Sequence, residues 1–220
     1  LYNQLTENPS QIVERVINSR CKCYAGHLHA RYSSNKGYAD NFDRLELFPG
    51  RLEAAARWSD LRGRPRPEEP WLNGLPRLIF VSDMGDSLAG RVEYEFLKTE
   101  VVDNALSDKG SRHIWLWLTK RPNRMASFSD WIQESGLNWP DNLVAMTTVT
   151  SSLTINRVHQ LQRVRSKYRG LSVEPLWEEV ELPLEGIDWV IVGGESGTSA
   201  RPFGLEWARS LREQCERVET

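Results

Sequence analysis

The chain has 220 residues, and its 28 lysines and arginines nearly balance its 30 aspartates and glutamates, giving a formal charge of −2. Charged residues make up 26% of the chain and apolar residues 40%, a balance typical of folded globular proteins that excludes a polycationic tail, a collagen-like repeat and a disordered chain. No apolar run is long enough to cross a membrane, no secretory signal is visible, and the three cysteines are too few for a disulfide framework. We therefore expect a cytoplasmic protein with reduced thiols.

The first third of the chain is irregular in pattern. Short helices are expected over residues 11–17 and 51–58. The proline-rich segment 63–70 predicts an extended surface connection, because proline fixes φ and lacks an N–H donor. We expect residues 1–75 to form an irregular N-terminal segment that packs with residues 76–220 as one domain.

From residue 76 onward, short β-rich runs alternate with helical stretches. The runs are apolar on both faces, as in a covered parallel sheet, and lie at residues 78–81, 114–118, 143–146, 170–173 and 189–192. Helices are expected between and after them, at residues 92–106, 125–134, 154–168 and 205–217. The alternation predicts an α/β fold with right-handed crossovers. An open doubly wound sheet and a β/α barrel share this pattern, and periodicity alone does not choose between them.

Polar residues and glycines follow the predicted strands. In both architectures, ligands bind beyond the carboxyl ends of the strands. The candidate cofactor-binding residues at these positions are Ser82, Asp83, Lys120, Thr148, Glu174, Gly193, Gly194, Glu195 and Ser196. Such carboxylates and hydroxyls can equally cap helices or hold turns. If they share one mouth, their mixed charge predicts a pocket for a zwitterionic or polar ligand.

The glycine-rich turn 193–197 would let main-chain amides approach a carboxylate or phosphate, because glycine carries no Cβ. It does not match the dinucleotide-binding fingerprint, the P-loop or the nucleophile elbow. Ser196 is therefore a poor candidate for a nucleophile.

Residues 154–170 carry five cations and no acid, namely Arg157, Arg163, Arg165, Lys167 and Arg169. A cationic helix can follow the phosphates of a nucleic acid, although a solvated helix face is the more common explanation. Nucleic-acid contact is therefore a weakly supported alternative.

Cys21 and Cys23 are separated by a single residue. As thiolates, both could ligate a soft metal or an iron-sulfur cluster, or they could be two reduced surface cysteines. His27 and His29 could complete a zinc site, although a helix beginning at Tyr24 would turn the two histidines apart.

Several motifs, in order, resemble a known family. They are Cys-Tyr-Ala at 23–25, Phe-Val-Ser-Asp-Met-Gly-Asp at 80–86, Trp-Leu-Thr-Lys-Arg-Pro at 117–122, Leu-Ser-Val-Glu-Pro-Leu at 171–176, Ile-Asp-Trp-Val-Ile-Val-Gly-Gly-Glu-Ser-Gly at 187–197, Ala-Arg-Pro at 200–202 and Arg-Glu-Gln-Cys at 212–215. From Cys21 to Cys215 the chain resembles the phage-associated proteins named after gene products 37 and 68, a family similar to radical S-adenosylmethionine (radical SAM) enzymes.

The resemblance implies a partial β/α barrel, incomplete at both ends, in which three cysteines hold a [4Fe-4S] cluster. S-adenosylmethionine would bind the open iron, and its reductive cleavage would give a deoxyadenosyl radical that abstracts hydrogen from a substrate. Cys21 and Cys23 would be cluster ligands, and the strand-end residues would hold the adenosyl part. The family pattern has an earlier cysteine followed by Cys-x-x-Cys, whereas this chain has only Cys21-x-Cys23. The chain is then a fragment, a degenerate copy, or a member that binds its cluster differently.

Two functions follow from these observations. The first is a radical SAM-like, cluster-binding protein of phage or mobile-element type whose substrate is unknown. The second is a non-catalytic binding or accessory protein that keeps the barrel, with contact to nucleic acid as its more weakly supported part.

Overall fold

A computed structural model describes residues 24–34, 38–42, 44–82, 84–197, 200–218 and 220. The chain divides into two compact units, Leu1–Phe48 and Pro49–Thr220. Cys21, Cys23, Asp83 and the helix expected over residues 11–17 lie outside the described residues. Packing of the N-terminal segment with the rest as one domain stays a prediction.

The first unit contains helix α2 (Tyr24–Tyr32). The helix begins at Tyr24, a start point that the sequence allowed without requiring it. His29 Nε2 lies 2.7 Å from the carbonyl oxygen of Ala39, and the His29 ring packs against Phe42 with 5.4 Å between centroids. His29 therefore links α2 to the residues that follow it within the same unit.

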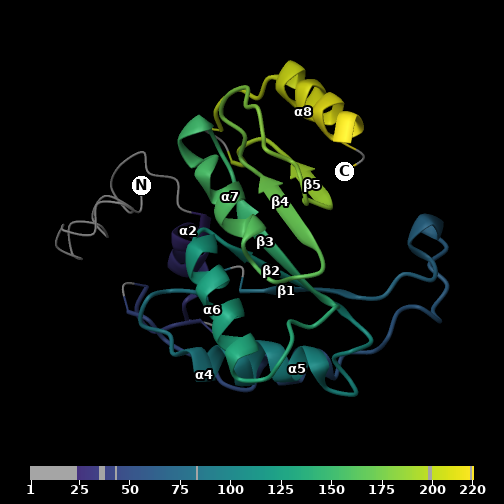
Figure 1. Cartoon of the computed structure of the whole chain (residues 1–220). Helices are drawn as coiled ribbons and strands as arrows, with labels where there is room; N and C mark the ends of the chain where they lie inside the picture. Colours follow the sequence, from purple (N-terminus) through teal and green to yellow (C-terminus); the bar gives the residue numbers. More distant parts are fainter. Residues whose placement is uncertain (1–23, 35–37, 43, 83, 198–199, 219) are drawn as a thin grey trace. The chain divides into compact units, whose positions relative to one another are not determined.

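The second unit is built on a five-stranded parallel sheet (Figure 1). Its strands are β1 (Leu78–Val81), β2 (Ile114–Thr119), β3 (Leu143–Thr148), β4 (Arg169–Val173) and β5 (Trp189–Val192). These bounds confirm the predicted α/β class and place each strand within two residues of its expected range. The spatial order is β1-β2-β3-β4-β5, the same as the order along the chain. A doubly wound sheet reverses its strand order at a switch point, so that alternative does not describe this sheet. Within the described residues the sheet is open, with β1 and β5 at its edges.

Helical segments connect the strands. They are α3 (Arg51–Ala56), α4 (Tyr94–Leu97), a π-helical turn η2 (Lys98–Val102), α5 (Asp103–Leu106), α6 (Pro122–Glu134), the 3₁₀ turn η3 (Ser152–Thr154), α7 (Asn156–Gln162) and α8 (Leu205–Val218). The run from α4 to α5 is continuous and matches the single helix expected over 92–106. Figure 1 shows α6 and α7 lying side by side over the sheet.

Helix α7 ends at Gln162, so the helix expected over residues 154–168 is shorter than predicted. Beyond it, the main-chain N–H of Arg165 donates to Ser129 Oγ at 3.2 Å. The Arg169 guanidinium donates to the carbonyl oxygen of Val164 at 2.6 Å. These two bonds, one long-range and one local, hold the chain in a turn that leads directly into β4.

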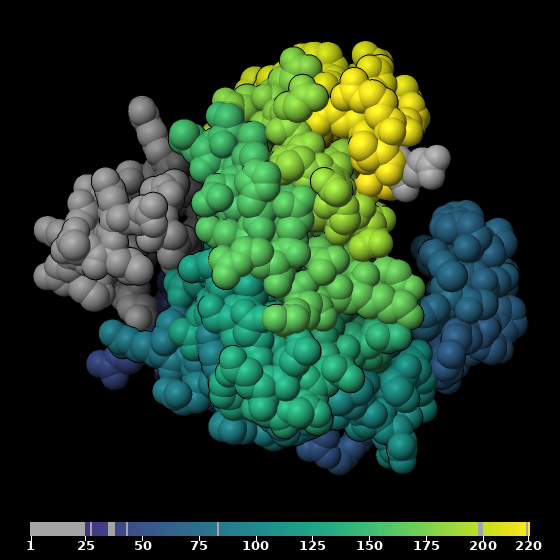
Figure 2. All heavy atoms as spheres, in the orientation of Figure 1, coloured from purple at the N-terminus to yellow at the C-terminus, as the bar shows by residue number. Residues whose placement is uncertain are grey.

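The segment between α3 and β1 is exposed, as expected, but it is folded rather than extended. A turn joins the Glu69 N–H to the Arg66 carbonyl oxygen at 3.1 Å, and the 3₁₀ helix η1 (Pro70–Leu72) follows. The Arg66 N–H donates to Asn73 Oδ1 at 2.7 Å, which closes the loop across seven residues. Figure 2 shows this blue segment standing away from the rest of its unit.

The core lies between the sheet and the helices. Alternate strand residues face the helices and are buried; they are Ile79, Val81, Trp115, Trp117, Leu143, Ala145, Leu171 and Val173. The Trp117 ring packs edge-on against Phe128 of α6 at 5.5 Å and stacks near Trp139 at 5.6 Å. Aromatic pairs of this kind add to the stabilisation that burial gives.

On the opposite face of the sheet the edge strands β1 and β5 are partly exposed, whereas Leu116 and Met146 of the central strands are buried. Leu78 is 54% exposed, Phe80 46% and Trp189 40%. Toward the carboxyl ends this face changes character, because Thr148 pairs with Ser172 and both are buried hydroxyl-bearing residues. The opposite face is thus apolar along the strands and polar at their ends.

Candidate functional site

The carboxyl ends of the five strands lie on one edge of the sheet, because all the strands are parallel. Most of the candidate residues named from the sequence fall on this edge. Thr148 ends β3, Ser82 and Glu174 follow β1 and β4, and Lys120 follows β2. The glycine-rich turn follows β5. We call this edge, with Ser82, Lys120, Thr148, Glu174 and Gly193, the strand-end site.

Ser82 leaves β1 in an unusual conformation. Its φ is 58°, the left-handed region that side chains other than glycine seldom adopt. Its Oγ is buried and has no hydrogen-bond partner among the described residues. Strained residues and unsatisfied buried hydroxyls each cost free energy, and both occur preferentially where a ligand is held. Ser82 therefore offers an unused hydroxyl at the strand-end site.

Glu174 packs onto the main chain of Gly193. A Cβ placed on Gly193 would lie 2.7 Å from Glu174 Oε1 and 2.8 Å from its Cδ, so only glycine admits the carboxylate there. The pairing is fixed by the main chain, since the Leu176 N–H donates to the Gly193 carbonyl oxygen at 2.9 Å. Glu174 itself is exposed. The structure thus presents a solvent-accessible carboxylate held against a glycine.

The other residues of the glycine-rich turn are engaged within their own loop. A Cβ on Gly194 would lie 3.1 Å from Phe203 Cβ, so Gly194 admits an aromatic side chain. Glu195 is mostly buried, and its Oε2 accepts the Arg201 N–H at 2.9 Å. The Arg201 guanidinium lies 4.2 Å from the centroid of the Trp177 ring. Ser196 is exposed. Glu195 therefore holds the turn in shape rather than facing an open pocket.

Asp86 organises the loops after β1 and β2. Its carboxylate accepts the Thr119 hydroxyl at 2.8 Å and the main-chain N–H groups of Lys120 and Leu88, each at 3.0 Å. This is the turn-holding role that a short carboxylate commonly takes. Lys120 is tied to Asp86 by its main chain, and its side chain is exposed.

Arg157 also reaches the strand-end edge, and sequence reasoning missed it there. It projects from the first turn of α7, and its Nη1 donates to the carbonyl oxygen of Thr148 at 2.9 Å. Burial lowers the pKa of the Arg157 guanidinium, while the charge of Asp86 raises it. Its position shortly after the third predicted strand could have indicated this role. The sequence had grouped it with the cations of a solvated helix face.

The remaining cations of residues 154–170 are largely paired. Arg165 lies 2.7 Å from Asp130, and Lys167 lies 2.9 Å from Asp141. Arg169 donates to a main-chain carbonyl oxygen, as described above, and Arg163 is exposed. Because two of these charges are neutralised by carboxylates, the segment offers fewer free cations to nucleic acid than its sequence indicates.

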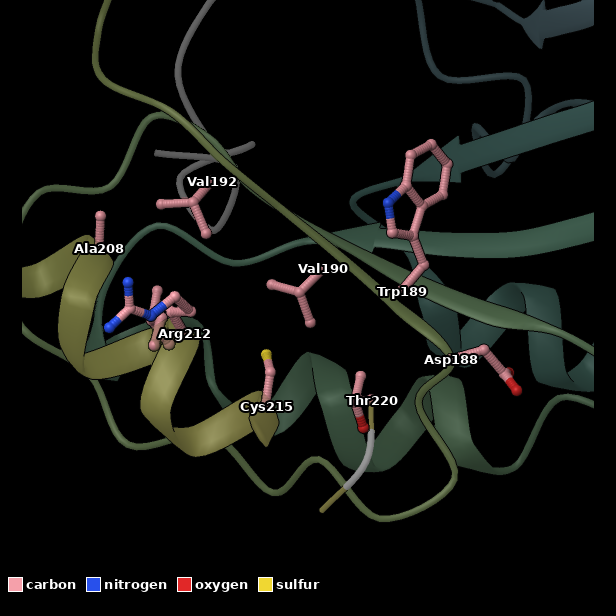
Figure 3. A pocket seen from close by; sticks show the side chains of 9 residues that line it. Asp188, Trp189, Val190, Val192, Ala208, Arg212, Cys215 and Thr220 are labelled. Atoms are coloured by element: carbon pink, nitrogen blue, oxygen red, sulfur yellow. The ribbon is translucent and has the colours of Figure 1, made fainter. Parts of the chain in front are cut away.

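A separate groove of about 230 Å³ lies between β5 and α8. Figure 3 shows Val190 and Cys215 facing it from the strand and the helix. Burial raises the pKa of the Cys215 thiol, which therefore stays protonated at neutral pH. A second hollow, of about 250 Å³, is lined by Gln162, Arg169, Glu185 and Gly186 near the start of β4. Both hollows are distinct from the strand-end site.

The described part of the chain shows neither a cluster of metal ligands nor a membrane-spanning helix. No three histidine, cysteine, aspartate or glutamate side chains there are grouped so that they could hold a metal ion, and Cys21 and Cys23 lie outside it. Among the same residues, no helix is both long enough and apolar enough to cross a bilayer.

Comparison with known proteins gives one match. No curated protein and no solved structure is significantly similar to the chain. A family model described as "Protein of unknown function (DUF5131)" matches residues 2–220. Because this match spans nearly the whole chain, the protein belongs to the DUF5131 family.

Proposed function

We propose that the protein is a radical SAM-like protein that binds S-adenosylmethionine at the strand-end site and a [4Fe-4S] cluster through Cys21 and Cys23. The observation that carries the proposal is the Glu174 carboxylate, held against Gly193 at the carboxyl edge of a parallel sheet whose strands follow chain order. The motifs that resemble the phage-associated family include both of these residues.

The sheet supports a partial β/α barrel. Right-handed crossovers between strands that follow chain order place every connecting helix on the same face. The other face is then left to line a barrel interior. Here that face is apolar at Leu78, Phe80 and Trp189, and it carries the hydroxyls of Thr148 and Ser172 toward the carboxyl ends. In this proposal a ligand rests on the polar end of the interior.

The side chains of the strand-end site fit the polar groups of S-adenosylmethionine. Its ammonium and ribose hydroxyls require acceptors such as the Glu174 carboxylate, and its carboxylate requires a cation such as Lys120. These two residues follow β4 and β2, which flank β3, so their main chains are roughly 10 Å apart. That separation suits a zwitterionic ligand of this size. The unused Ser82 hydroxyl supplies one further polar contact.

When bound, the cluster would supply the electron that cleaves S-adenosylmethionine. The chain's own residues have other tasks: Glu174 and Lys120 orient the ligand, and the apolar face beneath them excludes water. Cys21 and Cys23 lie outside the described residues, so the cluster itself must be tested by experiment.

Anaerobic reconstitution of the full chain with iron and sulfide tests the cluster. Metal counting, together with the visible absorption spectrum, should give about four irons per chain. Cys21→Ala and Cys23→Ala should each lose most of this iron. Cys215→Ala is the matched control, because Cys215 lies in the groove beside α8, and it should reconstitute like the wild type. If the wild type takes up no more iron than Cys21→Ala, the cluster proposal is wrong.

Calorimetric titration with S-adenosylmethionine tests the strand-end site. Glu174→Gln removes the charge but keeps the shape, and it should weaken binding about tenfold. Glu185→Gln, an exposed carboxylate beside the hollow at the start of β4, is the control and should bind like the wild type. Equal affinity for Glu174→Gln and the wild type would remove Glu174 from the site.

A further inference from the structure

Arg157 is a half-buried cation that forms no ion pair with any of the residues that the structure describes. Within the described part of the chain, its one hydrogen bond joins Nη1 to the Thr148 carbonyl oxygen at 2.9 Å. A guanidinium carries five N–H donors in a planar fork, so four of them are left over. None of its nitrogens is among the sealed side-chain atoms that lack partners, so the unused donors are open to solvent.

Among the described residues, Asp86 is the carboxylate whose charge acts on Arg157, and it does not neutralise the guanidinium. Asp86 contributes attraction, but its oxygens already accept the Thr119 hydroxyl and two main-chain N–H groups, and no salt bridge joins it to Arg157 in the described structure. A charge that is partly removed from water without a paired counter-charge is costly. The site therefore favours an anion that would face Arg157.

Arg157 differs from two other cations of its own segment. Arg165 and Lys167, from the same cationic segment, contact Asp130 and Asp141. Lys120 follows β2 at the same edge as Arg157, and its ammonium likewise has no carboxylate partner among the described residues. Among the described residues, Lys120 and Arg157 are therefore two cations without a carboxylate partner at the same edge of the sheet.

We propose that Arg157 is an anion-recognition residue that binds a carboxylate or phosphate group of a ligand at the carboxyl edge of the sheet. The inference rests on the proposed function only for the place of the ligand. The forked guanidinium of Arg157 suits two parallel hydrogen bonds to one planar or tetrahedral anion. The anionic group belongs either to S-adenosylmethionine itself or to a second ligand that carries a carboxylate or phosphate.

The test compares Arg157→Gln with the wild type in the full chain. Calorimetry would measure the binding of three probes: S-adenosylmethionine, 5′-methylthioadenosine, which lacks the carboxylate, and inorganic phosphate. Arg157→Gln removes a charge-assisted hydrogen-bonded pair. The variant should therefore bind the probe whose carboxylate or phosphate contacts Arg157 about 10- to 100-fold more weakly. Arg163→Gln is the matched control, since Arg163 is exposed at the end of the same helix. It should bind all three probes like the wild type.

Each outcome decides the inference. Weaker binding of S-adenosylmethionine with unchanged binding of methylthioadenosine would assign the anion to the methionyl carboxylate. Weaker binding of phosphate alone would assign it to a second ligand. The inference would be overturned if Arg157→Gln bound every probe as tightly as the wild type does. It would also be overturned if the wild type bound neither S-adenosylmethionine nor phosphate.

Two further measurements keep the inference testable if Arg157→Gln does not fold or if the protein binds no cluster. Arg157→Lys keeps the charge and the aliphatic stem but loses the fork, so it should bind severalfold more weakly even if Arg157→Gln does not fold. Phosphate binding needs no cluster. Suppose that the wild type takes up no iron but binds phosphate, and that Arg157→Gln loses the phosphate binding. That result would contradict the proposed function and still support this inference.

Discussion

At the amino ends of the strands, polar side chains bind main-chain carbonyl oxygens, whereas at the carboxyl ends several charged side chains have no partner in the described structure. Asn142 Nδ2 lies 3.0–3.2 Å from the carbonyl oxygens of Ala105, Gly110 and His113. Lys120 and Glu174, at the other end, are exposed. The amino end is tied together by hydrogen bonds, whereas our proposal assigns the carboxyl end to a ligand, the division of roles that is usual when parallel strands alternate with helices.

The largest effect should come from Gly110, at the amino end. A Cβ there would lie 1.8 Å from the main-chain oxygen of Asn104, and the Gly110 carbonyl oxygen also accepts the Trp115 indole N–H at 3.0 Å. Main-chain atoms cannot rotate away, so Gly110→Ala should lower the free energy of unfolding by about 3 kcal/mol in urea titrations. Gly63→Ala, which meets nothing within 4 Å, is the control. A loss below about 0.5 kcal/mol for Gly110→Ala would show that the amino end is not rigid.

His113 makes the amino end sensitive to acid. It is 1% exposed, and its Nε2 lies 3.2 Å from the Ala56 carbonyl oxygen. Burial lowers the pKa of His113 from its ordinary 6.5, and the charges of Arg112 and Arg77 lower it further, although its contacts with main-chain carbonyl oxygens oppose the shift.

Stability should therefore fall as the pH drops below about 6.5, because the unfolded chain then binds a proton that the folded chain refuses. The slope from this one group is at most about 1.4 kcal/mol per pH unit. Urea titrations from pH 8 to pH 5 should show a smaller loss for His113→Gln than for the wild type. His159→Gln changes an exposed histidine and should follow the wild-type curve. Equal curves for His113→Gln and the wild type would contradict a buried neutral His113.

The strands were predictable because each is a short, continuous apolar run bounded by polar residues or glycine. The predicted ranges 78–81 and 189–192 match β1 and β5, although one face of each of these edge strands is partly exposed rather than covered. The end of α7 was not predictable, because it depends on Ser129. The Ser129 hydroxyl accepts a hydrogen bond from the main-chain N–H of Arg165, 36 residues further along the chain. The fold of the proline-rich segment likewise depends on the Asn73 side chain, a contact that composition does not indicate.

The strand-end residues were predictable as a group but not one by one. Parallel strands place Lys120 and Glu174 on a single edge whatever their side chains do. Glu195 accepts a hydrogen bond from Arg201, and Arg157 donates one to Thr148. Both contacts depend on the paths of loops, which the hydrophobic periodicity of the sequence does not predict. Sequence patterns therefore locate an edge, and tertiary contacts decide which side chains remain free on it.

The smallest effect on stability, and the sharpest test of the contrast between the two ends, should come from Gly193. Its added Cβ would meet the carboxylate of Glu174, an exposed side chain that can rotate away, so Gly193→Ala should cost less than about 1 kcal/mol of stability. Binding of S-adenosylmethionine should nevertheless weaken about tenfold, because the carboxylate loses its position.

Adding Glu174→Ala to Gly193→Ala removes the clashing group, so the double variant should recover the lost stability but not the binding. That pattern would separate a glycine that positions a ligand-binding carboxylate from one, like Gly110, that the fold itself requires. If Gly193→Ala unfolded the protein as readily as Gly110→Ala, Glu174 would be a structural brace, and the carboxyl end would be organised in the same way as the amino end.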